Sequence, residues 1–402
     1  MKLALLNSSS RSSNFGLALT SRGLINSLQG RGHLVQEIGM PPALKGGLSS
    51  FSGYLNPSLF RSERLLFQKM LSFTTPRNAS EFDAIGEHLL SKSANKNERD
   101  MVDQLADSDA VILSGEGTFT RYNQTGALLM FLLWFAGEKL GKKTYFMNGS
   151  IGDLRYTHMF GMASRSLATT NFVAVREPLS LINANRLVGK NQSVTTSLVP
   201  DFAVPEILRF SPSGLIGSPG ENGESETSPV SLSLGMLPAN VARISSVRQQ
   251  EISPLLRQIE STFENHKVHA IIGGADREDR PLVSVAKSNN WSLLRGDGSE
   301  ESLKEFVRII SESMLLISGR YHHLLTAIIM NKPVISLETG SLKNEGLMRY
   351  FGYEGGDLQP GLVVDNDVEK LFTKSKKRKG SNTVDTQNKR EVKDYGFDHV
   401  RP

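Results

Sequence analysis

Short apolar runs alternate with longer amphipathic stretches along most of this 402-residue chain. Runs of strand length lie at 3–7, 35–38, 110–113, 144–147, 172–175 and 194–198, and again at 230–234, 268–272, 292–294, 314–317 and 333–337. Helix-length patterns lie between them, at 17–28, 59–71, 249–263, 303–312 and 324–330, and residues 127–135 are apolar all round. This alternation predicts parallel sheets covered by helices on both faces, with the 127–135 helix buried.

A polar break divides this series of strands and helices into two. Residues 211–228 read SPSGLIGSPGENGESETS, a composition typical of a linker or a long mobile loop. We therefore expect a Rossmann-like domain over residues 1–205, a linker over 206–228 and a second Rossmann-like domain over 229–370. Two such doubly wound domains would face each other across a cleft, and ligands would bind at the carboxyl ends of the strands.

The charge balance separates the end of the chain from the rest. The whole chain has 46 Lys and Arg against 41 Asp and Glu, a net charge of +5. Residues 371–402 hold nine of these bases and four of the acids, so residues 1–370 have 37 of each and are neutral. Because residues 371–402 have few apolar side chains, we expect a basic, disordered tail. A neutral body without clustered aromatic residues argues against nucleic-acid binding.

Several kinds of site and targeting segment find no support in the sequence. There is no cysteine, which excludes disulfides, thiolate metal sites and a cysteine nucleophile and fits a cytoplasmic protein. The apolar run at 3–6 is shorter than the about 7–15 residues of a signal peptide, and 127–136 is shorter than the about 20 residues that span a bilayer. Asp107 and Asp109 precede a strand instead of following it, so we expect no metal site there.

Residues 314–337 contain the most informative pattern. An apolar strand ends in Ser-Gly at 318–319 and an apolar helix follows, so Arg320 and His322 lie at the carboxyl end of the strand and in the first turn of the helix. A cation beside the positive end of a helix is unfavourable unless an anion binds between them. Arginine binds carboxylate or phosphate, and histidine transfers protons near neutral pH. A satisfied histidine in a solvated turn is the alternative, and His323 is expected to pack or to cap the helix.

Six motifs in chain order resemble the polysaccharide pyruvyl transferase family, in which Ser-x-Arg-x-His opens a C-terminal helix. They are Asn-Phe-Gly at 14–16, DAVILSGEG at 109–117, NGSIG at 148–152, VAVREP at 173–178, VPDFA at 199–203 and SGRYHHLLTAIIMNKPVISL at 318–337. The resemblance extends from about residue 3 to residue 351. Glu116 departs from it, since the corresponding turn is commonly all glycine.

The resemblance implies a GT-B-like fold and an enzyme that acts on phosphoenolpyruvate. Such enzymes transfer pyruvate to two hydroxyls of one sugar as a cyclic ketal and release phosphate, in surface or exopolysaccharide biosynthesis. No cofactor and no metal are implied. We expect Arg176, Arg320 and Tyr321 to bind phosphoenolpyruvate, because its three negative charges require cationic partners. We expect His322 to act as the general acid or base.

The acceptor is expected on the side of the N-terminal domain. A glycan or a lipid-linked saccharide would contact Asn14 and Gly16 in the first loop and Gly115, Glu116 and Gly117 in the later turn. The donor would then be held by the C-terminal domain. The basic tail is expected either to tether the protein to the anionic inner face of the cytoplasmic membrane or to keep it in solution.

Two other functions remain open at this stage, because the fold alone does not determine function. One is a GT-B glycosyltransferase that uses a nucleotide sugar, with Glu338 as the carboxylate for the ribose. The other is a non-catalytic protein that binds glycans or anions on the same scaffold.

Overall fold

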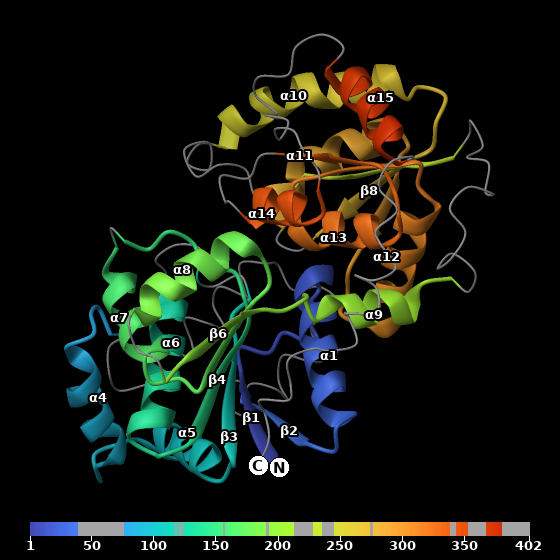
Figure 1. The fold of residues 1–402 in the computed structure, drawn as a ribbon. Helices are drawn as coiled ribbons and strands as arrows, with labels where there is room; N and C mark the ends of the chain where they lie inside the picture. Colours follow the sequence, from blue (N-terminus) through green and yellow to red (C-terminus); the bar gives the residue numbers. More distant parts are fainter. Residues whose placement is uncertain are drawn as a thin grey trace. The chain divides into compact units, whose positions relative to one another are not determined.

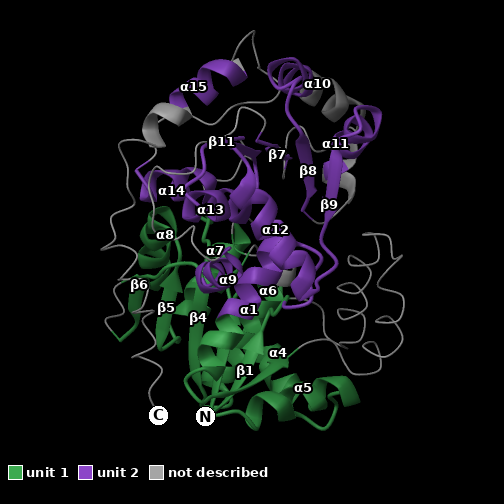
Figure 2. Ribbon diagram, turned by 90° about the vertical axis from the view of Figure 1, so that its right-hand side faces the viewer, with its two compact units in different colours: residues 1–9, 24–201, 394–402 green, residues 10–23, 202–393 purple. Residues whose placement is uncertain are grey.

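The computed structural model describes most of the chain and divides it into two compact units. The described residues are 1–38, 76–116, 119, 124–155, 157–189, 193–212, 228–234, 245–273, 276–337, 343–352 and 367–379. Among them, unit 1 comprises 1–9 and 24–201, and unit 2 comprises 10–23 and 202–379 (Figure 2). Each unit is a parallel sheet covered by helices, which confirms the predicted Rossmann-like α/β fold.

Unit 1 is built on a six-stranded parallel sheet in the order β2-β1-β3-β4-β5-β6 (Figure 1). Its strands are β1 (Lys2–Leu6), β2 (Leu34–Ile38), β3 (Ala110–Ser114), β4 (Lys143–Gly149), β5 (Phe172–Val175) and β6 (Thr195–Leu198). Its helices are α4 (Glu81–Leu90), α5 (Lys96–Ala106), α6 (Gln124–Glu138), α7 (His158–Leu167) and α8 (Pro178–Val188). Helix α1 (Phe15–Gln29) begins in unit 2 and ends in unit 1.

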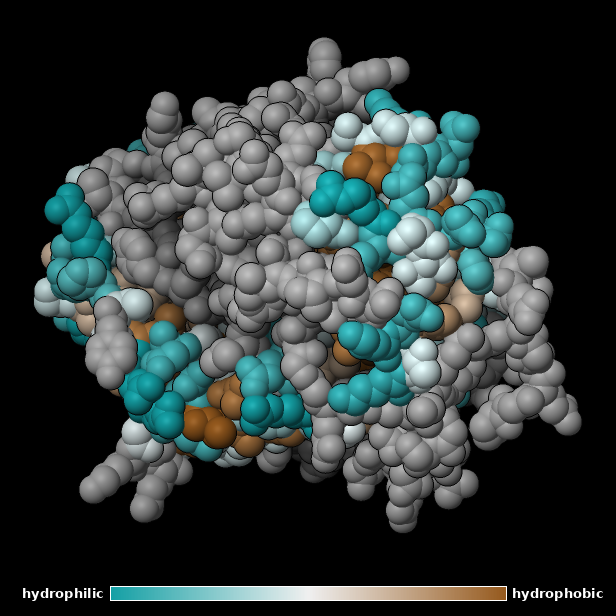
Figure 3. Space-filling view, turned by 90° about the horizontal axis from the view of Figure 1, so that it is seen from above, coloured by the Kyte–Doolittle hydropathy of each residue, from teal (hydrophilic) through white to brown (hydrophobic). Residues whose placement is uncertain are grey.

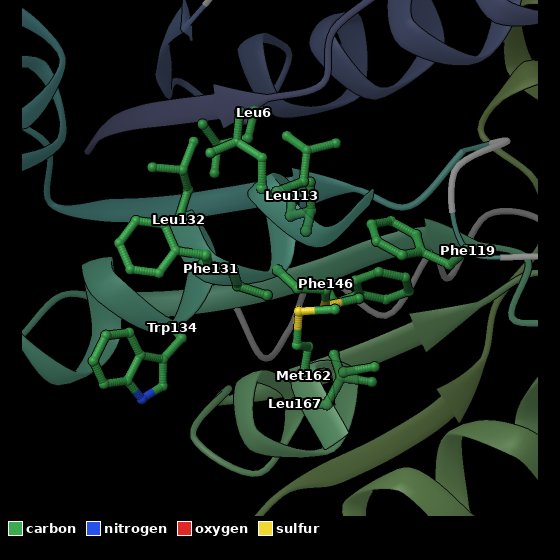
Figure 4. Close-up of a cluster of buried hydrophobic side chains, with 14 of the residues drawn as sticks. Leu6, Leu113, Phe119, Phe131, Leu132, Trp134, Phe146, Met162 and Leu167 are labelled. Atoms are coloured by element: carbon green, nitrogen blue, oxygen red, sulfur yellow. The ribbon is translucent and has the colours of Figure 1, made fainter. Parts of the chain in front are cut away.

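The core of unit 1 forms around α6, the helix predicted to be apolar on all sides. Side chains of α6, among them Phe131 and Trp134, lie between those of the sheet and those of α7 (Figure 4). The Phe82 ring of α4 packs against both, at centroid distances of 5.4 and 5.2 Å. Burial on all sides explains why this helix lacks the polar face of a surface helix.

Unit 2 is built on a five-stranded parallel sheet in the order β11-β10-β7-β8-β9. Its strands are β7 (Val230–Ser233), β8 (Val268–Ile272), β9 (Ser292–Arg295), β10 (Leu315–Ser318) and β11 (Val334–Ser336). Its helices are α9 (Ala203–Phe210), α10 (Ser245–Thr262), α11 (Asp276–Ser288), α12 (Glu300–Glu312), α13 (Tyr321–Ile329), α14 (Lys343–Tyr350) and α15 (Asp367–Lys379). Every predicted strand therefore forms in one of the two sheets.

Each sheet has one position where the strand order reverses. In unit 1 the chain goes from β1 outward to β2 and then returns to the other side of β1, so the reversal lies between β1 and β3. In unit 2 it proceeds from β7 to β8 and β9 and then returns to β10, so the reversal lies between β7 and β10. Open α/β sheets bind ligands at the carboxyl ends of strands beside such a reversal.

The predicted boundary of the N-terminal domain is wrong for residues 10–23, which pack in unit 2. The Phe15 ring stacks on Phe306 of α12, with centroids 4.5 Å apart and planes 10° from parallel. The Arg22 guanidinium donates to the carbonyl oxygens of Ser10 and Gly298. Burial of the apolar Phe15 ring in the core of unit 2 stabilises its position there, although β1 of unit 1 is close in sequence. The first half of α1 therefore belongs to unit 2.

Part of the predicted linker and part of the predicted tail are helical in the structure. Residues 206–210, assigned to the linker, form the end of α9, and Ile207 and Phe210 lie in the core of unit 2. Residues 371–379, assigned to a disordered tail, form most of α15, where the Phe372 ring contacts Phe263, the residue after α10. The remaining tail, 380–402, lies outside the described residues. The basic run KSKKRK at 374–379 therefore belongs to a helix of unit 2.

Surface hydrophobic residues are scattered over separate elements in the described part of the chain. Leu34, Leu90, Ile182 and Tyr350, the exposed large ones, come from β2, α4, α8 and α14. Figure 3 likewise shows brown residues interspersed with teal ones on one face. None of the helices in the described ranges is long and apolar enough to cross a membrane.

Candidate active site

Arg320 lies where the sequence predicted it, at the carboxyl end of β10 and immediately before α13. It is the N-cap residue of α13, with an extended backbone, and its side chain does not cap the helix. Its backbone N–H donates to Ser318 Oγ over 3.0 Å. Arg320 therefore does not cap the first-turn amides of α13, and the N-terminus of a helix favours an anion.

The Arg320 guanidinium extends toward the end of β8. Nη2 donates to Asp279 Oδ2 over 2.8 Å, and Nη1 donates to the carbonyl oxygen of Gly273 over 3.2 Å. A Cβ atom at Gly273 would overlap the Arg320 side chain, so glycine is required there for this path. Asp279 is fully buried, whereas the Arg320 side chain keeps 12% of its surface exposed. One carboxylate thus neutralises a guanidinium that still reaches solvent.

His322 lies in the first turn of α13 and packs against the first half of α1. Its Nε2 hydrogen-bonds Thr20 Oγ1 over 2.9 Å, and Thr20 is fully buried. A Cβ atom at Gly16 would overlap His322 Nδ1, so Gly16 makes room for the ring. Gly16 and Thr20 lie four residues apart on one face of α1 and together determine where the imidazole can lie.

Tyr321 and His323 flank His322 and are both buried. The Tyr321 ring belongs to the core of unit 2 and meets the His322 ring edge-on at 5.0 Å. Its contact with phosphoenolpyruvate stays a prediction, and its burial gives it a packing role. The His323 ring packs against Phe15 and Phe306, which stack on each other, with centroid distances of 6.1 and 4.8 Å. Burial lowers the pKa of His323 well below its usual range, and the charge of Arg320 adds to this effect. His323 therefore packs in the core, which is one of the two roles predicted for it.

Arg176 lies at the carboxyl end of β5 in unit 1 and is almost completely buried. Nη1 donates to Asp201 Oδ2 over 2.8 Å and lies 3.5 Å from Glu116 Oε1, and Nε donates to Ser150 Oγ over 2.8 Å. Only 1% of its side-chain surface is exposed. Two carboxylates already compensate this guanidinium, so an anion would have to compete with both of them. Donor binding by Arg176 stays a prediction.

Asn7 and Gly115 lie at the carboxyl ends of β1 and β3, beside the strand-order reversal of unit 1. Asn7, at φ +61°, donates from Nδ2 to the carbonyl oxygens of Ser114 and Glu116, over 2.8 and 3.4 Å. A Cβ at Gly115 would overlap the Phe146 ring, so Gly115 is required for packing of the β3 end. A left-handed backbone costs some strain at a residue other than glycine, and the two hydrogen bonds of the Asn7 side chain stabilise this conformation.

The predicted acceptor residues belong to two different units. Asn14 and Gly16 lie in unit 2, where Asn14 Oδ1 caps α1 by accepting from the Leu17 N–H over 3.3 Å. Gly115 and Glu116 lie in unit 1, and Glu116 is buried beside Arg176. Asn14 and Gly16 thus lie outside unit 1, because Phe15 between them packs in the core of unit 2, and acceptor binding by any of these residues stays a prediction. Gly117 and Glu338 lie outside the described residues.

Sequence reasoning missed Thr20 and Asp279, the two partners that hold His322 and Arg320. Thr20 carried a weak signal, since it lies one helical turn after Gly16. Asp279 lies on α11 and is brought to Arg320 only by the fold. Within the described ranges, no three His, Asp or Glu side chains gather in a way that could hold a metal ion.

The family model described as polysaccharide pyruvyl transferase matches residues 43–341, which are 299 of the 402 residues. The chain belongs to this family. A search of curated proteins gives no significant match. In this member of the polysaccharide pyruvyl transferase family, the matched range includes Arg176, Arg320 and His322 but ends before α14.

Solved structures with the same fold are sugar-nucleotide enzymes. UDP-GlcNAc 2-epimerase from Neisseria meningitidis, bound to UDP-GlcNAc, has a TM-score of 0.56 at 11% identity, over 93% of this chain and 94% of its own. S. aureus MnaA in complex with UDP has a TM-score of 0.53 at 10% identity, over 93% and 90%. A putative UDP-N-acetylglucosamine 2-epimerase from Listeria monocytogenes has 0.52 at 11%, over 95% and 88%. At such identities the likeness concerns the fold, which is the GT-B-like class that the sequence predicts for this pyruvyl transferase family member.

Proposed function

We propose that this protein transfers pyruvate from phosphoenolpyruvate to a sugar as a cyclic ketal, in surface or exopolysaccharide biosynthesis. Membership of the polysaccharide pyruvyl transferase family supports a pyruvyl transfer. The observation that carries the proposal is the placement of Arg320 and His322 together, at the carboxyl end of β10 and the start of α13. This edge offers a cation, helix amides and an imidazole to one small anionic substrate.

The reaction requires two carbon–oxygen bonds to form and one to break. Both sugar hydroxyl oxygens attach to C2 of the enolpyruvyl group, and the bond from C2 to the phosphate oxygen breaks. One hydroxyl proton ends on C3, which becomes a methyl group, and the other leaves with the phosphate as hydrogen phosphate. A residue that delivers and accepts protons near neutral pH serves both transfers.

In this proposal each of the two residues has a distinct task. Arg320 binds an anionic group of phosphoenolpyruvate by exchanging part of its pairing with Asp279 for the ligand. His322 protonates C3 or deprotonates a sugar hydroxyl, and Thr20 is a positioning residue for its ring. The hydrogen bond at one ring nitrogen holds the orientation of the ring, as second groups commonly do for functional histidines.

The test is phosphate release from phosphoenolpyruvate in the presence and absence of bacterial cell-surface glycans. We expect release that depends on an added glycan, together with a pyruvate ketal in the product, detected by NMR of its methyl group. His322→Ala should lower the turnover number by about 10²–10⁴-fold while phosphoenolpyruvate still binds. Turnover that persists in this variant would contradict the assignment of His322.

A nucleotide-sugar enzyme is the second candidate. The observation that favours it is the fold shared with proteins bound to UDP-GlcNAc or UDP. The same assay separates the two candidates when UDP-GlcNAc replaces phosphoenolpyruvate. Release of UDP or epimerisation of the sugar, with no phosphate from phosphoenolpyruvate, would favour this candidate. Binding of either compound without turnover would indicate a non-catalytic protein.

A further inference from the structure

Three serines stand side by side at the carboxyl ends of adjacent strands in unit 2. Ser318 ends β10 and is in register with Ser233 of β7 on one side and with Ser336 of β11 on the other. The β7–β10 pair is the position where the strand order of this sheet reverses. The three residues, called here the serine row, therefore lie where an open α/β sheet binds its ligands.

The serine row points to the face of the sheet that α13 covers. On β10, Leu315 and Ile317 belong to one core cluster, whereas Leu316 belongs to the cluster that contains α13. Because side chains alternate along a strand, Ser318 lies on the side of Leu316. Register places Ser233 and Ser336 on the same side. All three hydroxyls thus face the region at the start of α13.

Two of these hydroxyls are buried and have no hydrogen-bond partner. Ser233 is 0% exposed and Ser336 is 6% exposed, and neither Oγ finds a partner in the structure. In contrast, Ser318 Oγ accepts from the Arg320 N–H, and Ser231, two residues earlier on β7, bonds Ser313 Oγ over 2.7 Å. Buried polar groups are nearly always paired, so these two hydroxyls make the edge a candidate site for a polar ligand.

The Arg320 side chain passes the end of β7. Arg320 follows β10, and its guanidinium reaches Gly273 at the end of β8. Since β7 lies between β10 and β8, this path leads past the end of β7, where Ser233 lies. An anion at this edge would therefore meet both the Ser233 hydroxyl and the guanidinium.

We propose that the serine row, the first-turn amides of α13 and Arg320 together bind the phosphate group of the phosphoenolpyruvate donor. This assignment rests on the proposed function. A phosphate ester has three terminal oxygens and accepts several hydrogen bonds, and this edge supplies two unpaired hydroxyls, helix amides and a guanidinium. Asp279, whose Oδ1 has no partner in the structure, competes with the ligand for Arg320. Such competition permits the phosphate to leave after the reaction.

Removal of the unpaired hydroxyls should affect stability and ligand binding differently. Replacing Ser233 or Ser336 by alanine removes a buried group that lacks a partner, so the melting temperature of the free protein should not fall. The same change removes a donor to a charged ligand, which weakens phosphate binding by about ten-fold per hydroxyl. A merely structural serine would lose stability and leave the affinity unchanged.

The experiment is calorimetric titration of the full chain with inorganic phosphate, phosphoenolpyruvate and pyruvate. The variants are S233A, S336A and their combination, and the matched control is S231A, on the same strand and face but already paired with Ser313. We expect the double variant to bind phosphate and phosphoenolpyruvate about 100-fold more weakly, from two hydroxyls at ten-fold each. Pyruvate, which has only the carboxylate, should bind the parent, S233A, S336A and the double variant equally. S231A should match the parent for all three ligands.

Three results would overturn the assignment or the function separately. If the double variant keeps the phosphate affinity of the parent, and the parent releases phosphate from phosphoenolpyruvate, the serine row does not bind phosphate. The proposed function would still hold. Weaker pyruvate binding with unchanged phosphate binding would show that the serine row binds the carboxylate of the donor and not its phosphate. The third result is phosphate binding that follows the predicted pattern in a parent protein that does not turn over phosphoenolpyruvate. The phosphate site would then hold, and the proposed function would be wrong.

Discussion

Arg176 and Arg320 have the same sequence context and opposite environments. Each lies at the carboxyl end of a buried strand of a parallel sheet, Arg176 directly after β5 in unit 1 and Arg320 shortly after β10 in unit 2. Arg176 is paired with Asp201, lies close to Glu116 and is almost completely buried. Arg320 is paired with Asp279 and keeps 12% of its side-chain surface exposed.

This difference shows that the position of an arginine after a strand does not determine its surroundings. An anion approaching Arg176 would meet the nearby carboxylates of Asp201 and Glu116, which oppose a further negative charge. Arg320 reaches solvent at the start of a helix, where an anion is favoured. We propose that Arg320 contributes more to ligand binding than Arg176 does.

The largest expected effect is on catalysis at Arg320. R320Q should lower kcat/KM for phosphoenolpyruvate by about 10²–10³-fold, because a preorganised cation aimed at the substrate is lost. R308Q, which removes an exposed arginine that pairs with Glu305 and Glu312 on α12, is the control and should change kcat/KM less than two-fold or so. Equal losses in both variants would contradict the special role of Arg320.

The next effect is on stability at Arg176. R176M should lower the free energy of unfolding by about 3–5 kcal/mol, because Asp201 and Glu116 would remain buried without their cation. Denaturant unfolding monitored by circular dichroism measures this change. Adding D201N to R176M should restore part of the lost stability. If R176M folds like the parent and loses only phosphoenolpyruvate affinity, Arg176 binds the donor after all.

A smaller effect is expected at Thr20, which holds His322. T20V should lower kcat by about 10–100-fold and change KM little, because the imidazole loses the bond that orients it. T20S keeps the hydroxyl and should restore most of the rate. The pH profile of kcat should shift in T20V and not in T20S. Loss of activity in both variants, with unchanged pH profiles, would indicate a packing role for Thr20.

The smallest effect concerns the pH dependence of stability at His323. Burial lowers the pKa of this histidine in the folded state, so between that pKa and the unfolded value near 6.5 only the unfolded state binds the proton. The free energy of unfolding should therefore fall as the pH is lowered through this window, by up to about 1.4 kcal/mol per pH unit.

H323F keeps a ring packed against Phe15 and Phe306 and removes the proton site, so it should flatten this dependence. Urea unfolding at pH 7.5 and 5.5 on both proteins gives the difference. His269, whose pKa burial also lowers, is present in both proteins and cancels in the comparison. Parallel slopes in the two proteins would show that His323 does not bind a proton on unfolding in this range.

The sheet edges were predictable from the sequence because their signal is local. Apolar runs such as 110–113 and 314–317 form strands wherever both faces are covered, and Ser-Gly-Arg at 318–320 ends a strand and begins a helix by itself. The same holds for α6, whose continuous apolar surface identifies a buried helix before any neighbour is known. These features require no knowledge of what lies opposite.

The sequence by itself determined the two parallel sheets, the position of Arg320 and His322 at a strand end, and the family. Only the tertiary structure decided which groups surround them: Asp201 and Glu116 around Arg176, Asp279 at Arg320, and Thr20 at His322. The physical reason is that strand and helix formation depend on neighbours a few residues away. Charge pairing and the choice of unit for 10–23 depend on burial against residues up to about 300 positions distant, which periodicity cannot report.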